Sequence, residues 1–302
     1  MRAQLLAAAA LLVTAGPAGA WTRPAHMVTA AIAFDQMERE APELIGPLGE
    51  LLDAHPDRGP FEVAIDRAEG RERVRRMFLE CARWPDDIRR TAQDRPAWHA
   101  SLTPQGPDAG GQPVHGAATE AFALNYRVLA DPAATSAERA QALCWVLHIG
   151  GDAHQPLHAA QWFSEAFPEG DRSGGFQYVR DPLTGRVTNL HWLWDDAVHR
   201  QGDIESVNAR AVELAQLYPR AQLAETVAPA AARDFPAWLS NESLPIARNV
   251  AYGPALRAGS TLSDAPRVPE AYWVQVSEIS ARRVAVAGYR LGDLVRAALA
   301  PD

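Results

Sequence analysis

Two pairs of histidine and aspartate are the residues of this 302-residue chain best suited to bind a metal ion. The pairs are His148 with Asp152 and His191 with Asp195, and in each pair the residues are four apart. On an α-helix, this step places both side chains on one face. An imidazole nitrogen and a carboxylate oxygen on one face suit zinc, which binds both kinds of atom at about 2.0–2.2 Å. The spacing therefore predicts two helix faces that bind zinc.

A further candidate ligand, His158, follows the first pair closely along the chain. Pro156 should end the helix of His148 and Asp152, because a proline ring removes a donor and clashes with the preceding turn. His158 lies just beyond and can turn back toward the same cavity. His154 falls on another side of the turn, so we expect it to support ligands rather than to bind metal. Hydrogen-bonded core histidines are the alternative, and the repeated four-residue step argues against it.

The first twenty residues have the composition of a secretory signal peptide. Arg2 gives a positive start, residues 5–13 are apolar, and Ala18-Gly-Ala20 is a small-residue cleavage signal. We expect cleavage after Ala20, which leaves a mature domain of residues 21–302 with Trp21 at its N-terminus. A retained anchor is the alternative, but the apolar run is too short for a bilayer of roughly 30 Å. The sequence thus predicts a secreted or periplasmic protein with no membrane anchor.

Charge and cysteine content limit what the chain can do. A formal net charge of −8 gives no long-range attraction to phosphate polymers, so binding nucleic acid would require multivalent cations. Cys81 and Cys144 are the two cysteines. Export permits a disulfide between them, whereas two buried thiols fit the sequence equally well.

Apolar residues at helical spacing predict an all-α protein with one mostly helical domain. The helices are expected over residues 25–37, 71–89, 117–130, 136–152, 190–198, 206–217, 224–239 and 272–299. Long loops are expected over 102–116 and 167–188, the second with a small β-hairpin of residues 176–179 and 186–188. Since no break in composition divides the chain, we expect a single compact body.

Seven segments in order resemble the zinc-dependent single-strand-specific nucleases, the S1/P1 nuclease family. The segments are residues 21–26, 84–89, 98–99, 148–158, 189–195, 238–243 and 281–291. The resemblance covers nearly the whole mature chain, and the ordered set is far more specific than any one segment. It implies the helical fold that zinc nucleases share with phospholipase C.

The resemblance also implies three Zn²⁺ ions in one cleft. One ion would be bound by Asp86, His99, His148 and Asp152, and a second by His158, His191 and Asp195. The third would be bound by the α-amino nitrogen and carbonyl oxygen of Trp21 together with His26 and Asp152. Cleavage after Ala20 would then have a chemical purpose, because only a free amine can bind the metal. Without the resemblance, Trp21 and His26 suggest an ordinary helix start.

The activity implied is hydrolysis of single-stranded DNA and RNA to 5′-phosphate products, with cleavage of 3′-nucleotides as well. Zinc ions lower the pKa of a shared water to about 7. Asp86 would orient this water, and Arg89 would bind a phosphate oxygen through its planar fork. A solvated helix-end arginine is the alternative for Arg89. No stable protein partner is implied, and we expect a monomer.

The chain departs from the family where the nucleobase would bind. After His99 the family commonly has an aromatic residue and then an aspartate, but this chain has Ala100-Ser-Leu102. The family segment Asp-x-Gly-Gly-Asn is here Asp171-Arg-Ser-Gly-Gly-Phe176, and the Phe176 ring could supply the missing stacking surface. Base preference therefore stays open.

Two other functions fit parts of the pattern. A zinc-dependent phospholipase C shares the fold and the three-zinc arrangement, but its last ligand pair typically ends in glutamate rather than Asp195. A zinc store, or a structural zinc site in a binding module, is the non-enzymatic alternative. Structural sites are usually closed by four ligands, often thiolates, and neither cysteine is a plausible ligand here.

Overall fold

Helices dominate the computed structural model, which describes residues 21–227 and 234–300. The α-helices are α1 (Arg23–Glu40), α2 (Ile45–Asp53), α3 (Arg58–Ile65), α4 (Gly70–Asp87), α5 (Ala118–Ala130), α6 (Ser136–Asp152), α7 (Leu190–Asp195), α8 (Ile204–Leu217), α9 (Ala224–Val227), α10 (Phe235–Ala237), α11 (Leu244–Ile246) and α12 (Glu270–Leu299). Short 3₁₀ segments include η2 (Pro96–His99) and η3 (Pro156–Ala159), and π-helical turns form η5 (Trp238–Ser243) and η6 (Ala247–Ala251). The prediction of an all-α fold is confirmed.

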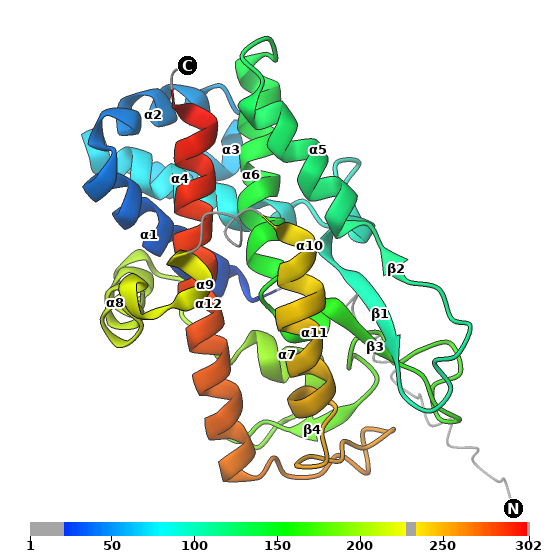
Figure 1. Cartoon of the computed structure of the whole chain (residues 1–302). Coiled ribbons are helices and arrows are strands. Elements are labelled where there is room, and N and C mark those ends of the chain that lie inside the picture. Colours follow the sequence, from blue (N-terminus) through cyan, green and yellow to red (C-terminus); the bar gives the residue numbers. More distant parts are fainter. Residues whose placement is uncertain (1–20, 228–233, 301–302) are drawn as a thin grey trace, which may run out of the picture.

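The helix α12 runs through the middle of the molecule (Figure 1). It packs along α1 on one side and against α5 and α6 on the other, while α4 lies against both α1 and α6. One continuous apolar core fills the space between these helices. A second, smaller core lies under α7 and the first half of α12. None of the helices in the described ranges is long and apolar enough to cross a membrane.

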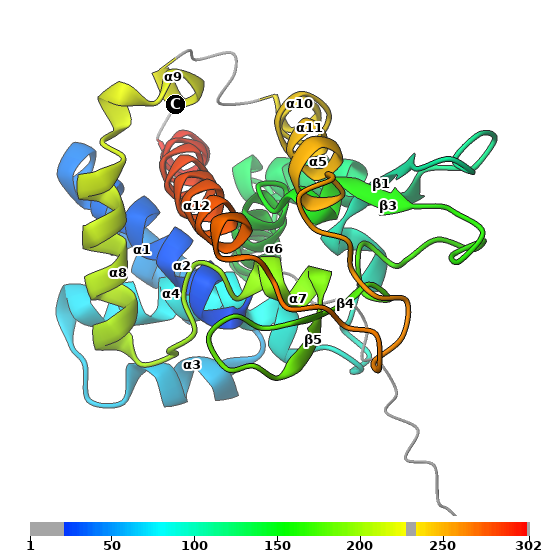
Figure 2. The same cartoon turned by 90° about the horizontal axis from the view of Figure 1, so that it is seen from below.

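Two small sheets accompany the helices. Strand β1 (Ser101–Gln105) lies between β2 (His115–Gly116), which is antiparallel to it, and β3 (Ala160–Trp162), which is parallel. Strands β4 (Tyr178–Arg180) and β5 (Val187–Asn189) form the second sheet, which confirms the predicted hairpin. Figure 2 shows β1 and β3 at the edge of the molecule opposite α8.

Three predictions about local structure are wrong. Residues 102–116 are not a plain loop, because most of β1 and all of β2 lie there. The strand was not predicted because Pro104 and Gly106 are residue types that disfavour strand interiors. The helices α2 and α3 were not expected, since Gly and Pro crowd their first turns, where both residues are tolerated. A continuous helix over 224–239 is also wrong, because the Asp234 side chain caps a new helix at Phe235. Residues 1–20, the predicted signal peptide, lie outside the described part of the chain.

A disulfide joins Cys81 on α4 to Cys144 on α6, with a Cα–Cα distance of 4.6 Å. This outcome resolves the two alternatives that the sequence left open. Both residues are fully buried in the main core.

The contact between α1 and α12 depends on Gly288. A β-carbon at this position would lie 2.7 Å from Cβ and Cγ2 of Ile32 and 3.0 Å from the Thr29 carbonyl oxygen. We expect Gly288→Ala to lower the free energy of unfolding by about 1–3 kcal/mol, because an overpacked core must shift. Urea denaturation measures this loss. Gly46→Ala on α2 is the matched control, since no atom lies within 4 Å of its added β-carbon and stability should not fall. Equal stability of both variants would contradict the packing argument.

Candidate metal centre

The C-terminal end of α6 carries the first predicted pair. A capping box between Thr135 and Glu138 fixes the start of this helix, and Pro156 opens the 3₁₀ segment that follows it. His148 and Asp152 are both fully buried, with 3.3 Å between His148 Nε2 and Asp152 Oδ2. The predicted shared helix face is therefore present.

The second pair lies on α7, a short helix that Asn189 caps by accepting a hydrogen bond from the Trp192 amide at 2.8 Å. His191 Nε2 lies 3.4 Å from Asp195 Oδ2, and both side chains are buried. The hairpin formed by β4 and β5 leads directly into this helix. The small sheet thus positions the second pair.

Eight of the predicted ligands gather in three clusters of mutually close donor atoms. The clusters are His26 with His148 and Asp152, Asp86 with His99 and His148, and His158 with His191 and Asp195. Within each cluster the donor atoms lie within 4.8 Å of one another, and every member is buried. The clusters bring together segments that are far apart in the chain. These segments are α1, α4, η2, α6, η3 and α7.

Asp152 lies at the middle of this arrangement. Its Oδ1 is 3.2 Å from His26 Nε2 and 3.7 Å from His158 Nδ1. Its Oδ2 is 3.3 Å from both His99 Nδ1 and His148 Nε2. One buried carboxylate therefore faces four imidazoles.

Backbone carbonyls fix the orientation of three imidazole rings. The pairs are His148 Nδ1 with Ala82 O (2.9 Å), His158 Nδ1 with His99 O (2.7 Å) and His191 Nδ1 with Ser173 O (2.8 Å). Because a carbonyl oxygen only accepts hydrogen bonds, each Nδ1 carries the proton of its ring. In the neutral rings, each Nε2 then presents a lone pair to the cluster, as metal-binding histidines do.

The arrangement of donor atoms in the clusters fits bound cations. His158 Nε2 and His191 Nε2 lie 3.3 Å apart, and two lone pairs at this distance need a positive charge between them. Elsewhere in the clusters, five buried side-chain atoms of the described residues lack a hydrogen-bond partner. They are both ring nitrogens of His26, His99 Nε2, Asp152 Oδ1 and Asp195 Oδ2. Nitrogen and oxygen donors without thiolates match a catalytic zinc site.

Burial shifts the pKa values of two members of the clusters, lowering that of His148 and raising that of Asp195. Burial, reinforced by the nearby His26, lowers the pKa of His148 to about 3, so this imidazole is neutral and able to bind metal. Burial raises the pKa of Asp195 well above its usual range, and Gln155 opposes this by donating a hydrogen bond to Oδ1 at 2.7 Å. A carboxylate in such a place lacks a counter-charge, which a cation would provide.

Asp86 and Arg89 lie together at the end of α4. Arg89 Nε donates to Asp86 Oδ1 at 2.7 Å, and Arg89 Nη2 lies 3.3 Å from His99 Nδ1. The Arg89 side chain keeps 19% of its surface exposed, more than the ligands around it. Its guanidinium therefore lies between the cluster and solvent.

Trp21 lies beside the centre. Its buried indole donates a hydrogen bond to the Gly151 carbonyl at 3.0 Å, next to Asp152 in the chain. A β-carbon on Gly151 would lie 3.0 Å from His26 Nδ1, so the glycine leaves room for this ring. The prediction about the Trp21 α-amino group concerns its bond to Ala20, which is outside the described residues.

The structure keeps the other histidines out of the clusters. His154, as expected, has a supporting place: its Nδ1 donates to the Gly150 carbonyl at 2.7 Å and its Nε2 accepts from Arg290 at 2.9 Å. Asp196 and His199 are half-buried. His115 is exposed, in β2.

Sequence reasoning missed the groups that orient the ligands. Gln155 was visible inside the motif, but nothing in the pattern indicated that its amide would contact Asp195. Ser173 contributes only a backbone carbonyl, which no residue type reveals. Its turn is unusual, because Arg172 and Ser173 have positive φ angles of 55° and 57°. The buried Asp171 carboxylate stabilises this turn by accepting the Gly174 amide at 2.8 Å.

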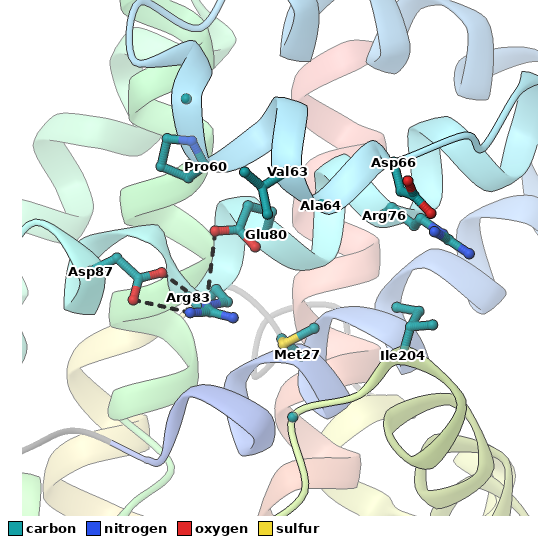
Figure 3. Close-up of a pocket in the computed structure, with 12 residues that line it drawn as sticks. Met27, Pro60, Val63, Ala64, Asp66, Arg76, Glu80, Arg83, Asp87 and Ile204 are labelled. Carbon is teal, nitrogen blue, oxygen red and sulfur yellow. Dashed lines mark hydrogen bonds and ion pairs between the residues drawn. The ribbon is translucent and has the colours of Figure 1, made fainter.

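The opposite face of α4 lines a separate pocket of about 490 Å³ (Figure 3). Glu80, Arg83 and Asp87 lie along this face, with Met27 and Val63 among the apolar side chains around them. Arg83 Nε lies 2.8 Å from Asp87 Oδ2 and 3.8 Å from Glu80 Oε1. The pocket is lined by none of the predicted ligands.

Fold and site together define a helical protein built around buried clusters of histidine and aspartate side chains. A family model described as S1/P1 Nuclease matches residues 21–300. The chain therefore belongs to the S1/P1 nuclease family, which confirms the resemblance found in its sequence. No curated protein matches the chain significantly.

The buried Glu80 should make stability depend on pH. Burial raises the pKa of Glu80 to about 7 against an ordinary value of 4.5, although the Arg83 charge opposes the shift. The folded chain thus binds this proton more tightly than the unfolded chain. The contribution of this proton to the free energy of unfolding is fully present below pH 4.5 and is lost as pH rises through about 7.

We therefore expect Glu80→Gln to gain stability relative to the parent chain by up to about 3 kcal/mol between about pH 5 and about pH 8. Urea denaturation across this range measures the difference. Glu72→Gln, on an exposed side chain of the same helix, is the control and should follow the parent curve. Parallel curves for Glu80→Gln and the parent would contradict the shift.

Proposed function

We propose that this S1/P1 family member is a zinc-dependent nuclease that hydrolyses single-stranded DNA and RNA to 5′-phosphate products. We propose that it also removes the phosphate of 3′-nucleotides. The observation that carries the proposal is the grouping of three buried donor clusters around Asp152. Several divalent ions held so close together suit phosphodiester hydrolysis.

The proposed ligand sets follow the clusters. One ion is bound by Asp86, His99, His148 and Asp152. A second ion is bound by His158, His191 and Asp195, and a third by Trp21, His26 and Asp152. When bound, zinc lowers the pKa of a coordinated water and neutralises charge on the phosphate. The mutual distances and the donor atoms without hydrogen-bond partners support the histidine and aspartate members of these sets, whereas Trp21 is included because of the family resemblance.

Asp86 and Arg89 perform the remaining tasks in this proposal. The Asp86 carboxylate accepts a hydrogen bond from the attacking water and so aims it at phosphorus. The Arg89 guanidinium, at the exposed side of the cluster, binds a non-bridging phosphate oxygen. Its present contact with Asp86 holds the side chain in place before substrate arrives.

Burial of the ligands supports a preference for single strands. His148, Asp152 and Asp195 are fully buried, so a phosphate has to approach closely to reach them. An unpaired nucleotide can bend into such a site, whereas a duplex would first have to open. Stacking of its base on an aromatic ring contributes roughly 1–3 kcal/mol without reading sequence. Phe176, whose ring lies 4.8 Å from the Arg172 guanidinium, is our candidate for this surface.

Export and a monomeric state belong to the same proposal. The family match begins at Trp21, which supports cleavage after Ala20. A phospholipase C activity is the alternative function, and the family match favours the nuclease. Assays of one preparation with single-stranded DNA, RNA, a 3′-nucleotide and phosphatidylcholine separate the two functions. Hydrolysis of phosphatidylcholine alone would refute the nuclease proposal.

Substitution of Asp86 and Arg89 tests their roles. We expect Asp86→Asn to retain bound zinc and to lose at least about 100-fold in kcat, because the attacking water is no longer aimed. Arg89→Ala should lose about 10- to 1000-fold, with partial recovery in Arg89→Lys. Steady-state kinetics on single-stranded DNA, with elemental analysis of zinc, measures both effects. Arg127→Ala, on an exposed face of α5, is the control and should keep full activity. Normal turnover by Asp86→Asn would support a zinc store instead.

A free amine at Trp21 is a separate requirement. A version of the protein with two extra residues before Trp21 should bind one zinc ion fewer and lose most of its activity, because an amide nitrogen replaces the amine. The control is the same protein processed so that Trp21 is its first residue. Three zinc ions and full activity in the extended version would show that Trp21 is no ligand.

A further inference from the structure

We propose that the Cys81–Cys144 disulfide is a positioning element of the metal centre, which sets the spacing of two ligand-bearing helices. The disulfide links α4, which carries Asp86, to α6, which carries His148 and Asp152. The inference rests on the proposed zinc centre and deepens it. It assigns a task to the two cysteines that are not ligands themselves.

The crosslink lies within about one helical turn of the ligands. Cys144 precedes His148 by four residues on α6, which is about 6 Å along the helix axis. Cys81 directly precedes Ala82, whose carbonyl oxygen accepts the Nδ1 proton of His148 at 2.9 Å. The disulfide and this hydrogen bond therefore join the same turns of the same two helices. A shift of either cysteine should therefore also shift His148, through α6 from Cys144 and through the Ala82 carbonyl on α4 from Cys81.

Packing makes this contact sensitive to the state of the cysteines. Both cysteines are fully buried, so the crosslink lies inside the packed core between the two helices. Without the covalent bond, only packing contacts set the spacing of α4 and α6. Zinc ligation tolerates deviations of only about 0.2 Å. Loss of the crosslink should therefore let the spacing vary by more than the Asp86, His99 and His148 cluster accepts.

The cluster of His158, His191 and Asp195 should be less affected by loss of the crosslink. His158, His191 and Asp195 lie on η3 and α7, and carbonyls of His99 and Ser173 orient their imidazoles. Neither α4 nor the disulfide contributes to these contacts. Loss of the crosslink should thus weaken the ions bound through His148 and Asp152 and spare the ion of this cluster, whereas general destabilisation would act on all three alike.

The test compares zinc release from three forms of the mature protein. The first is the parent chain, the second Cys81→Ala/Cys144→Ala, and the third Leu214→Ala as a matched control. Leu214 is fully buried on α8, which carries no ligand, so this variant loses stability without touching the centre. After loading with zinc alone, a chromophoric chelator reports the rate and number of ions released, and circular dichroism reports folding.

We expect the ions bound through His148 and Asp152 on α6 to leave the double variant at least 10-fold faster, with the ion of His158, His191 and Asp195 unchanged. Leu214→Ala should show no such difference between the ions. Parent-like release from the folded double variant would overturn the inference. If that variant does not fold, zinc release from the loaded parent chain after reduction by a phosphine, with thiols counted, decides the question in the same way. A parent chain that binds no zinc would refute the proposed function itself, whereas three equally retained ions would refute only this inference.

Discussion

The burial of Asp152 among four imidazoles is the constraint on which the rest of the site depends. A carboxylate with no exposed surface is costly unless charges or hydrogen bonds compensate it. Here, His26, His99, His148 and His158 all turn a nitrogen toward its two oxygens. Neutral imidazoles offer lone pairs as well as protons, so they compensate the carboxylate fully only when cations lie between them. The fold has thus concentrated donor atoms that fit together around metal and fit poorly without it.

The scaffold limits how these donors can move. Each of three imidazoles is held by a backbone carbonyl from a different segment, so ring orientation is set by main-chain geometry rather than by flexible side chains. The carbonyl of Ser173 lies in a turn of two non-glycine residues with positive φ, a conformation that costs energy and persists only when surrounding contacts enforce it. Asp171 provides those contacts by accepting the amides of Trp162 and Gly174. Backbone strain here serves the orientation of His191.

The sequence predicted which donor side chains come together better than it predicted the groups that orient them. A histidine and an aspartate four residues apart share a helix face by geometry alone, and Pro156 marks where the first helix must end. Both features follow from local rules, and the structure contains both. The carbonyls of Ala82 and Ser173 follow from tertiary packing, which residue types do not encode.

The errors in the fold have the same origin. Strand β1 is stabilised by pairing with β2 and with β3, which is distant in the chain, so Pro104 and Gly106 misled a local interpretation. The helices α2 and α3 bury apolar side chains such as Leu48 and Phe61 against the main core, which outweighs the glycine and proline in their first turns. Local propensity is a weak guide wherever packing of this kind decides the outcome.

Charge explains why an acidic protein can act on a polyanion under this proposal. The chain has a net charge of −8, spread over a surface where salt screens charges beyond about 8–10 Å. At the centre, Asp86, Asp152 and Asp195 are the acidic ligands, and burial keeps their field from being screened. Three divalent cations would more than balance three carboxylates, which reverses the sign of the local potential while leaving the surface acidic. Attraction to phosphate then acts only at short range and only where the ions lie. A substrate would be bound by the phosphate that reaches the cluster rather than by a broad basic surface, which fits a nuclease that accepts short and unpaired strands.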